Sequence, residues 1–224
     1  MSAREVRARA AVGDDEIETA TFAPEEPLAA MAIAHGAGYA MDHPFMAGFA
    51  RRIAELGVAA VRFNFVYTQK GRKAPDPEPK LRSAWLAAFD ATRAAFGDIP
   101  ALCAGKSLGG RIASMCVADG MPAAGLVFLG YPFHAPGRTD RVRDTHLDAI
   151  RVPMLFLEGT RDPFADPDVV ERVLRRLGDR ADLIEIDGGD HSFNVRGATR
   201  DHADVGAALA DVAMPFVRRV TGAG

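Results

Sequence analysis

The stretch ALCAGKSLGG, residues 101–110, decides how the rest of the chain is interpreted, because two incompatible patterns overlap in it. Its GKS triplet is the end of the phosphate-binding loop GxxxxGKS. The overlapping GKSLG fits GxSxG, the sharp turn between a strand and a helix that presents a nucleophilic serine. The first pattern predicts a nucleotide-binding protein, and the second predicts a hydrolase.

The residues before the triplet argue against the phosphate-binding loop. That loop needs a glycine five positions before Gly105, so that its amides can wrap around phosphates, and this position is Pro100. Residues 99–104 instead have the composition of a strand that runs straight into the turn. Small residues stand two places either side of Ser107, as the nucleophile turn requires. We therefore expect Ser107 to be a nucleophile, although a serine here could also simply cap the following helix.

Composition and charge narrow the class of protein. The chain has 224 residues, of which 48% are hydrophobic and 25% charged, so we expect one domain over residues 1–224. A formal net charge of -3 gives no basic surface for nucleic acid. No apolar run is long enough for a membrane span or a signal peptide. These features predict a cytoplasmic protein without nucleic-acid or membrane partners, and they leave its oligomeric state open.

The two cysteines do not suggest a metal site. Cys103 and Cys116 lie in apolar segments and lack the CxxC spacing of metal-binding or redox motifs. We expect both to be buried free thiols, and we expect neither a metal nor a cofactor.

Short apolar runs alternate with helical patterns along the chain. The runs cover residues 28–35, 58–65, 99–105, 125–130, 152–159 and 181–187. Their near-continuous apolar character is typical of parallel strands that are covered on both faces. Alternating polar and apolar residues in the first two dozen positions predict an antiparallel hairpin at the edge. The fold class is therefore α/β, with a mostly parallel sheet of about eight strands flanked by helices on both faces.

The helical patterns have recognisable starts and ends. Asp42 is predicted to cap a helix that has Pro44 in its first turn and ends at Gly57. Trp85 belongs to an apolar stripe over residues 81–96, so we expect it in the core. Further helices are expected over residues 108–115, 167–178 and 205–216.

Candidate partners for Ser107 follow two later strands. Asp162 stands in GTRDPF after the fifth long apolar run, and His191 stands in GGDHSF after the sixth. Along the chain the order is therefore Ser107, Asp162, His191, which is the order expected for this kind of nucleophile turn. In such a set, the histidine would take the proton of the serine, while the aspartate would hold the imidazole and stabilise its cation. Asp166 or Asp168 could take the place of Asp162, and His202 is the alternative to His191.

The loop after the first long apolar run is a candidate oxyanion hole. It reads HGAG at residues 35–38. The backbone amides of Ala37 and of Leu108, which follows the nucleophile, would supply the two donors that an oxyanion needs. His35 is expected to brace this loop.

Taken together, these stretches resemble a known family. AHGAG, VRFNF, AGKSLGGRIASM, GLVFLGYPFHAPG, GTRDPF and GGDHSF span residues 34–193 and are similar to small single-domain α/β-hydrolases of the dienelactone hydrolase-like group. The most similar branch contains predicted hydrolases and chromatin-complex subunits. The resemblance implies an α/β-hydrolase fold with Ser107, Asp162 and His191 as the catalytic triad.

Two features of the resemblance limit what it implies. Dienelactone hydrolases proper use a cysteine nucleophile, whereas this chain has Ser107, so lactone specificity does not follow. The chromatin-subunit relatives imply an alternative function, a noncatalytic interaction module. The intact set of triad residues favours the enzyme.

The segment after Gly130 is too short for a cap domain, which predicts an open site. An open site suits a small ester, thioester or lactone that is cleaved through an acyl-Ser107 intermediate. Loops 66–77 and 131–138 are expected to border the site, and their basic residues could bind a carboxylate-bearing or phosphate-bearing ester or could simply be solvated. The residues concerned are Tyr67, Arg72, Lys73, Tyr131, His134 and Arg138.

Overall fold

An eight-stranded sheet of order β1-β2-β4-β3-β5-β6-β7-β8 forms the centre of the structure. The structure is a computed structural model that describes residues 4–198 and 200–223. Pairing from β4 through β3 to β8 is parallel, and β1 and β2 form an antiparallel hairpin that joins β4. The strands are β1 (Val6–Val12), β2 (Asp15–Phe22), β3 (Ala29–Ala34), β4 (Val58–Phe63), β5 (Ala101–Lys106), β6 (Leu126–Leu129), β7 (Met154–Gly159) and β8 (Ala181–Ile186).

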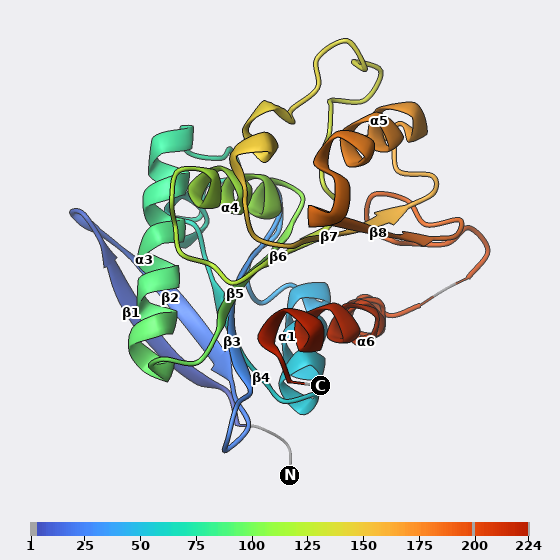
Figure 1. Ribbon diagram of the computed structural model, residues 1–224. Helices are drawn as coiled ribbons and strands as arrows, with labels where there is room; N and C mark the ends of the chain where they lie inside the picture. The colour runs from blue at the N-terminus through green and yellow to red at the C-terminus, as the bar shows by residue number, and fades with distance from the viewer. Residues whose placement is uncertain (1–3, 199, 224) are drawn as a thin grey trace.

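Helices cover both faces of this sheet (Figure 1). Apolar side chains of α1 and α6 pack on one face, and those of α3, α4 and α5 pack on the other. Every residue of β3 to β7 is buried, which explains why their sequences are almost continuously apolar. The helices are α1 (Pro44–Glu55), α2 (Val66–Gln69), α3 (Glu78–Phe96), α4 (Leu108–Ala118), α5 (Pro167–Leu177) and α6 (His202–Thr221), with two 3-10 helices, η1 (Thr145–Ala149) and η2 (Gly178–Arg180).

The predicted fold class, edge hairpin and buried Trp85 are confirmed, but the predicted cap of α1 is wrong. His43 is the N-cap, and its Nδ1 accepts a hydrogen bond from the Phe45 N–H at 3.3 Å. Asp42 instead forms an ion pair with Arg7 of the edge hairpin. The paired arginine is distant in sequence, so no local pattern could indicate this competition for the Asp42 carboxylate.

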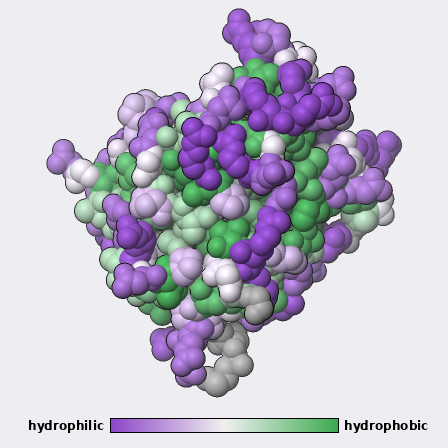
Figure 2. Space-filling model, in the orientation of Figure 1, coloured by the Kyte–Doolittle hydropathy of each residue, from purple (hydrophilic) through white to green (hydrophobic). Residues whose placement is uncertain are grey.

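Among residues 4–198 and 200–223, no lid covers the carboxyl ends of the parallel strands. Between β6 and β7 the chain forms a loop over residues 130–144 and then η1, and every residue of this segment is described. Figure 2 shows hydrophilic side chains gathered at the top of the molecule, where this loop lies. Throughout the described ranges, each helix is either too short or too polar to cross a lipid bilayer.

Candidate active site

Ser107 lies in a strained turn between β5 and α4. Its φ of 48° and ψ of -112° are rare for a residue with a side chain, and such strain is frequent at functional sites. The turn is closed tightly: a Cβ on Gly105 would stand 2.2 Å from the Gly110 nitrogen, and one on Gly109 would stand 2.6 Å from the carbonyl oxygens of Ala34 and His35. Only glycine therefore fits either side of the serine.

A buried tryptophan holds the start of α4 in place. The indole N–H of Trp85, in α3, donates a hydrogen bond to the Gly109 carbonyl at 2.9 Å. Since the ring is fully buried, this bond fixes the first turn of α4 against α3. The core role predicted for Trp85 thus includes support of the Ser107 turn.

Ser107, His191 and Asp162 form a continuous chain of hydrogen bonds. The Ser107 Oγ lies 2.9 Å from His191 Nε2, and His191 Nδ1 lies 2.6 Å from Asp162 Oδ2. The other Asp162 oxygen accepts the Phe164 N–H at 2.8 Å, so both oxygens of this buried carboxylate are occupied. His191 remains partly exposed, with 21% of its side chain accessible. This arrangement leaves the imidazole open to solvent beside the hydroxyl.

The alternative residues lie elsewhere. Asp166 caps α5 by accepting the backbone N–H groups of Asp168 and Val169. Asp168 lies within the first turn of the same helix and is exposed. His202 begins α6 and its ring lies 5.3 Å from that of His43. Of the candidate aspartates, only Asp162 hydrogen-bonds to the histidine that contacts Ser107.

Lys106, which the sequence analysis missed, holds the loop that carries His191. Its side chain is 2% exposed, and its Nζ donates to the His191 carbonyl at 2.5 Å. Burial lowers the pKa of this ammonium group to about 8, against the opposing effect of nearby acids such as Asp162. The feature of the sequence that could have identified Lys106 is its position at the end of a predicted strand, directly before Ser107. The same loop contains Phe193, whose φ of 62° is also strained.

The HGAG loop passes directly over the Ser107 turn. A Cβ on Gly36 would stand 3.5 Å from the Ser107 Cβ, and Ala37 is exposed beside the serine. His35 braces the loop, as expected: its Nδ1 lies 2.8 Å from the Gly36 carbonyl, and its Nε2 accepts the Phe65 N–H. Because Nε2 accepts, Nδ1 carries the proton and the ring is neutral.

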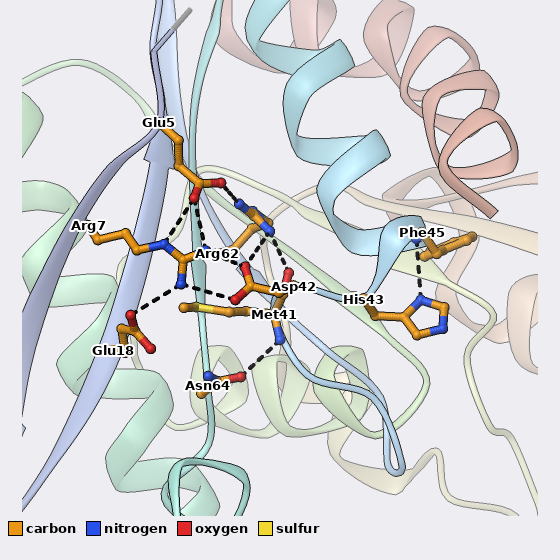
Figure 3. A network of polar contacts seen from close by, with 9 residues as sticks. All are labelled: Glu5, Arg7, Glu18, Met41, Asp42, His43, Phe45, Arg62 and Asn64. Atoms are coloured by element: carbon orange, nitrogen blue, oxygen red, sulfur yellow. Dashed lines mark hydrogen bonds and ion pairs between the residues drawn. The ribbon is translucent and has the colours of Figure 1, made fainter. Parts of the chain in front are cut away.

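An ionic network around the buried Arg62 holds the far end of this loop (Figure 3). Arg62, in β4, is fully buried and donates to the Met41 carbonyl at 2.6 Å. The Asn64 side chain accepts the Met41 N–H at 2.9 Å. Arg62 also pairs with Asp42 and with Glu5 of the segment before β1. The edge hairpin is thereby tied to the loop that approaches Ser107.

Comparison with known proteins identifies the family. A family model described as alpha/beta hydrolase domain matches residues 27–218, which is most of the chain. The chain belongs to the alpha/beta hydrolase family.

Solved structures of other hydrolases share this fold. An α/β serine hydrolase without lid from Xanthomonas campestris superposes with a TM-score of 0.75 at 21% identity, with 95% of each chain covered. Dienelactone hydrolase from Anabaena variabilis gives 0.75 at 18% identity, with 96% of this chain and 99% of that chain covered. An α/β serine hydrolase homologue from Coxiella burnetii gives 0.73 at 18% identity, with 96% and 98% covered. At these identities, the likeness shows the fold.

Two cavities flank Ser107 in this α/β-hydrolase, and Ala37 and His191 line both of them. The smaller, here the Tyr39 cavity, has about 130 Å³ and is lined by Gly36, Ala37, Tyr39, Lys106, Ser107, His191 and Ser192. The larger, here the Arg111 cavity, has about 400 Å³ and is lined by Ala37, Pro75, Ser107, Leu108, Arg111, Pro132, Arg143, Phe164 and His191.

Loops 66–77 and 131–138 border the site as predicted, since Pro75 and Pro132 line the Arg111 cavity, but none of the six side chains predicted there lines either cavity. Tyr131 is fully buried among Phe128, Phe133 and Phe156, and its hydroxyl donates to the Arg143 carbonyl. This tyrosine is a core residue, because residues 130–134 remain buried after β6 ends.

The other predicted border residues also lie away from Ser107. His134 is buried, with Nδ1 against the Ala135 carbonyl and Nε2 accepting the Asp166 N–H. Tyr67, Arg72 and Lys73 line a separate cavity of about 240 Å³ beyond Tyr39. Arg72 is paired there with Asp76, and Arg138, in the loop after β6, is paired with Asp140. The basic rim predicted from these residues is therefore not formed at Ser107.

The cysteines are placed as expected. Cys103 and Cys116 are both buried and free, and burial raises the pKa of both thiols, that of Cys116 to about 11. Both thiols therefore stay protonated at neutral pH. Within the described ranges, no three His, Cys, Asp or Glu side chains converge as metal ligands would.

The neutral rings of the buried His35 and the half-buried His146 make stability depend on pH. Burial lowers the pKa of His35 to about 4, and burial together with the charge of Arg111 lowers that of His146 to about 4. The unfolded chain binds these protons near pH 6.5, so stability that is present at neutral pH is lost as the pH falls from about 6.5 to about 4. For His35 alone we expect a loss of about 2 kcal/mol by pH 5.

Urea denaturation at several pH values measures this dependence. The free energy of unfolding should decrease steadily between about pH 7 and about pH 5, and His146→Asn should make the decrease shallower. A free energy of unfolding that stays constant over this range would contradict the neutral state of the two rings.

Proposed function

We propose that this α/β-hydrolase is a serine esterase that cleaves small carboxylic esters through an acyl-Ser107 intermediate. One observation carries the proposal: the hydrogen-bonded series from Ser107 through His191 to Asp162 ends in a hydroxyl that is open to two cavities. A serine hydroxyl becomes a nucleophile when an adjacent base can accept its proton and a third group orients that base.

The first half of the reaction forms the acyl-enzyme. The Ser107 Oγ attacks the ester carbonyl carbon while His191 Nε2 takes the hydroxyl proton. Asp162 keeps the other ring proton on Nδ1 and stabilises the imidazolium that results. The negative oxygen of the tetrahedral intermediate is bound by the amides of Ala37 and Leu108. When the intermediate collapses, the carbon–oxygen bond breaks and the leaving alcohol takes the proton from His191.

The second half repeats these steps with water. His191 removes a proton from a water molecule, which attacks the acyl carbon, and the same proton is returned to Ser107 as the acid leaves. His191 must therefore move protons in both halves without changing its position. The bond from Lys106 to the His191 carbonyl and the contact of the Phe164 ring, 4.2 Å from the imidazole centroid, limit its movement.

The size of the cavities supports a small substrate. Volumes of about 130 Å³ and about 400 Å³ fit short acyl and alcohol groups, and the described segment between β6 and β7 forms no lid that would enclose a long chain. Among proteins of similar fold, one is described as a serine hydrolase without lid and one as a dienelactone hydrolase, which agrees with a small ester or lactone.

Steady-state hydrolysis of a graded ester series tests the proposal. We expect acetyl and butyryl esters of 4-nitrophenol to be hydrolysed with an initial burst equal to the enzyme concentration if deacylation is slower than acylation. The palmitoyl ester should give a kcat/KM at least about tenfold lower. Parallel thioesters and lactones establish whether the oxygen ester is preferred. Folded protein that hydrolyses none of these substrates would overturn the proposal.

A further inference from the structure

Two arginines that the catalytic steps do not use line the Arg111 cavity beside Ser107. Arg111 comes from the first turn of α4, and Arg143 comes from the loop before η1. In the part of the chain that the structure describes, neither has a carboxylate within ion-pair distance. Other arginines of the same region are paired, namely Arg82 with Glu78 and Asp119, Arg138 and Arg141 with Asp140, and Arg176 with Asp144 and Asp148.

The positive charges of the two guanidinium groups are also not balanced by any described acidic side chain that lines the cavity. No aspartate or glutamate occurs among its described lining residues. The nearby acids are already engaged, Asp144 with Arg176 and Asp162 with His191. Partial burial and the positive charge of Arg111 lower the pKa of Arg143. The two positive charges repel each other. An anion bound between the two arginines would offset this repulsion, beside the proposed nucleophile Ser107.

Both arginines are attached to rigid backbone. Arg111 stands one helical turn after Ser107, and its N–H donates to the Ser107 carbonyl at 3.0 Å. The Arg143 N–H donates to the Phe133 carbonyl at 2.7 Å, and the Arg143 carbonyl accepts the hydroxyl of buried Tyr131 at 2.8 Å. Little backbone freedom is therefore lost when these side chains bind a ligand.

We propose that Arg111 and Arg143 form an anion subsite that binds a carboxylate carried by the ester substrate. Guanidinium groups present paired donors that match the two oxygens of a carboxylate. A cavity of about 400 Å³ holds a short chain between that carboxylate and the ester bond. The favoured substrate is accordingly a short ester that has one ionised acid group. The subsite rests on the proposed esterase function, since it lies in the same cavity as the serine that is proposed to react.

Matched acid and amide esters test this subsite. Ethyl hydrogen glutarate and its uncharged amide, ethyl glutaramate, place the group in the acyl part, whereas 4-carboxyphenyl and 4-carbamoylphenyl acetate place it in the leaving group. In at least one pair, we expect wild type to favour the acid by about tenfold or more in kcat/KM.

Arginine variants then locate the effect. Arg111→Gln and Arg143→Gln should each lose about ten times more kcat/KM on the favoured acid than on its amide, mainly through a higher KM. Arg141→Gln is the matched control, because this exposed arginine of the same loop lies outside the cavity and should leave the acid preference intact. Free glutarate should inhibit more strongly than inorganic phosphate.

The outcomes separate this inference from the esterase proposal. Wild type that hydrolyses acid and amide equally in both pairs would overturn the subsite but support the esterase. Variants that lose equal activity on acid and amide would likewise overturn it, and stronger inhibition by phosphate would overturn the assignment of a carboxylate. If wild type hydrolysed neither these four esters nor 4-nitrophenyl acetate, the esterase proposal itself would fail.

Discussion

Ser107→Ala is expected to lower kcat/KM for a short ester by on the order of 10⁴ to 10⁶-fold. The expected loss is large because the variant keeps both cavities and the loop amides but removes the hydroxyl that we propose attacks the acyl carbon. The free energy of unfolding should change by less than about 1 kcal/mol, since the hydroxyl bonds to the partly exposed His191.

Activity and stability must be measured on the same preparations. Hydrolysis of 4-nitrophenyl acetate gives the first quantity, and urea denaturation gives the second. If Ser107→Ala retained most of the activity, another nucleophile would be responsible. If it lost several kcal/mol of stability, Ser107 would be a structural residue at the start of α4, as the helix-cap alternative requires.

Asp162→Asn is expected to lower kcat by about 10⁴-fold while the fold is preserved. An asparagine can donate to His191 Nδ1 and so favour the tautomer with the proton on Nε2, where it cannot accept the Ser107 proton. It also removes the negative charge that stabilises the imidazolium. Single-turnover hydrolysis of 4-nitrophenyl acetate by wild type and by Asp162→Asn measures this loss directly.

Asp166→Asn is the matched control for this substitution. Asp166 is four residues further along and caps α5, a role that asparagine fills as well as aspartate. Its kcat should stay within about twofold of wild type, and its stability within about 0.5 kcal/mol. Equal losses of kcat in the two variants would contradict the assignment of Asp162 as the orienting carboxylate.

Periodicity and the alternation of apolar runs with helical patterns were sufficient to predict most of the fold. The central strands are almost continuously apolar because helices cover both of their faces, and this signal is local. The cap of α1 was mispredicted because Asp42 pairs with Arg7, which is 35 residues away. Such competition depends on tertiary contacts that no local window contains.

The order of Ser107, Asp162 and His191 along the chain also indicated that these three side chains meet, since parallel strands bring their carboxyl ends to one edge of the sheet. The residues around them were harder to predict, because loop side chains can point either way. Tyr131 and His134 face the core, whereas Arg143 of the same loop faces the cavity. Arg111 had a local signal, because a residue four places after Ser107 on α4 shares its face of the helix.

The measurement that tests the central claim most directly is the intact mass of the protein after treatment with a fluorophosphonate. This reagent phosphonylates a serine only when an adjacent base activates the hydroxyl. We expect one adduct on wild type, none on Ser107→Ala, and much slower labelling of Asp162→Asn. An unlabelled wild type that is folded, or an adduct that persists in Ser107→Ala, would contradict the claim that Ser107 is the activated nucleophile.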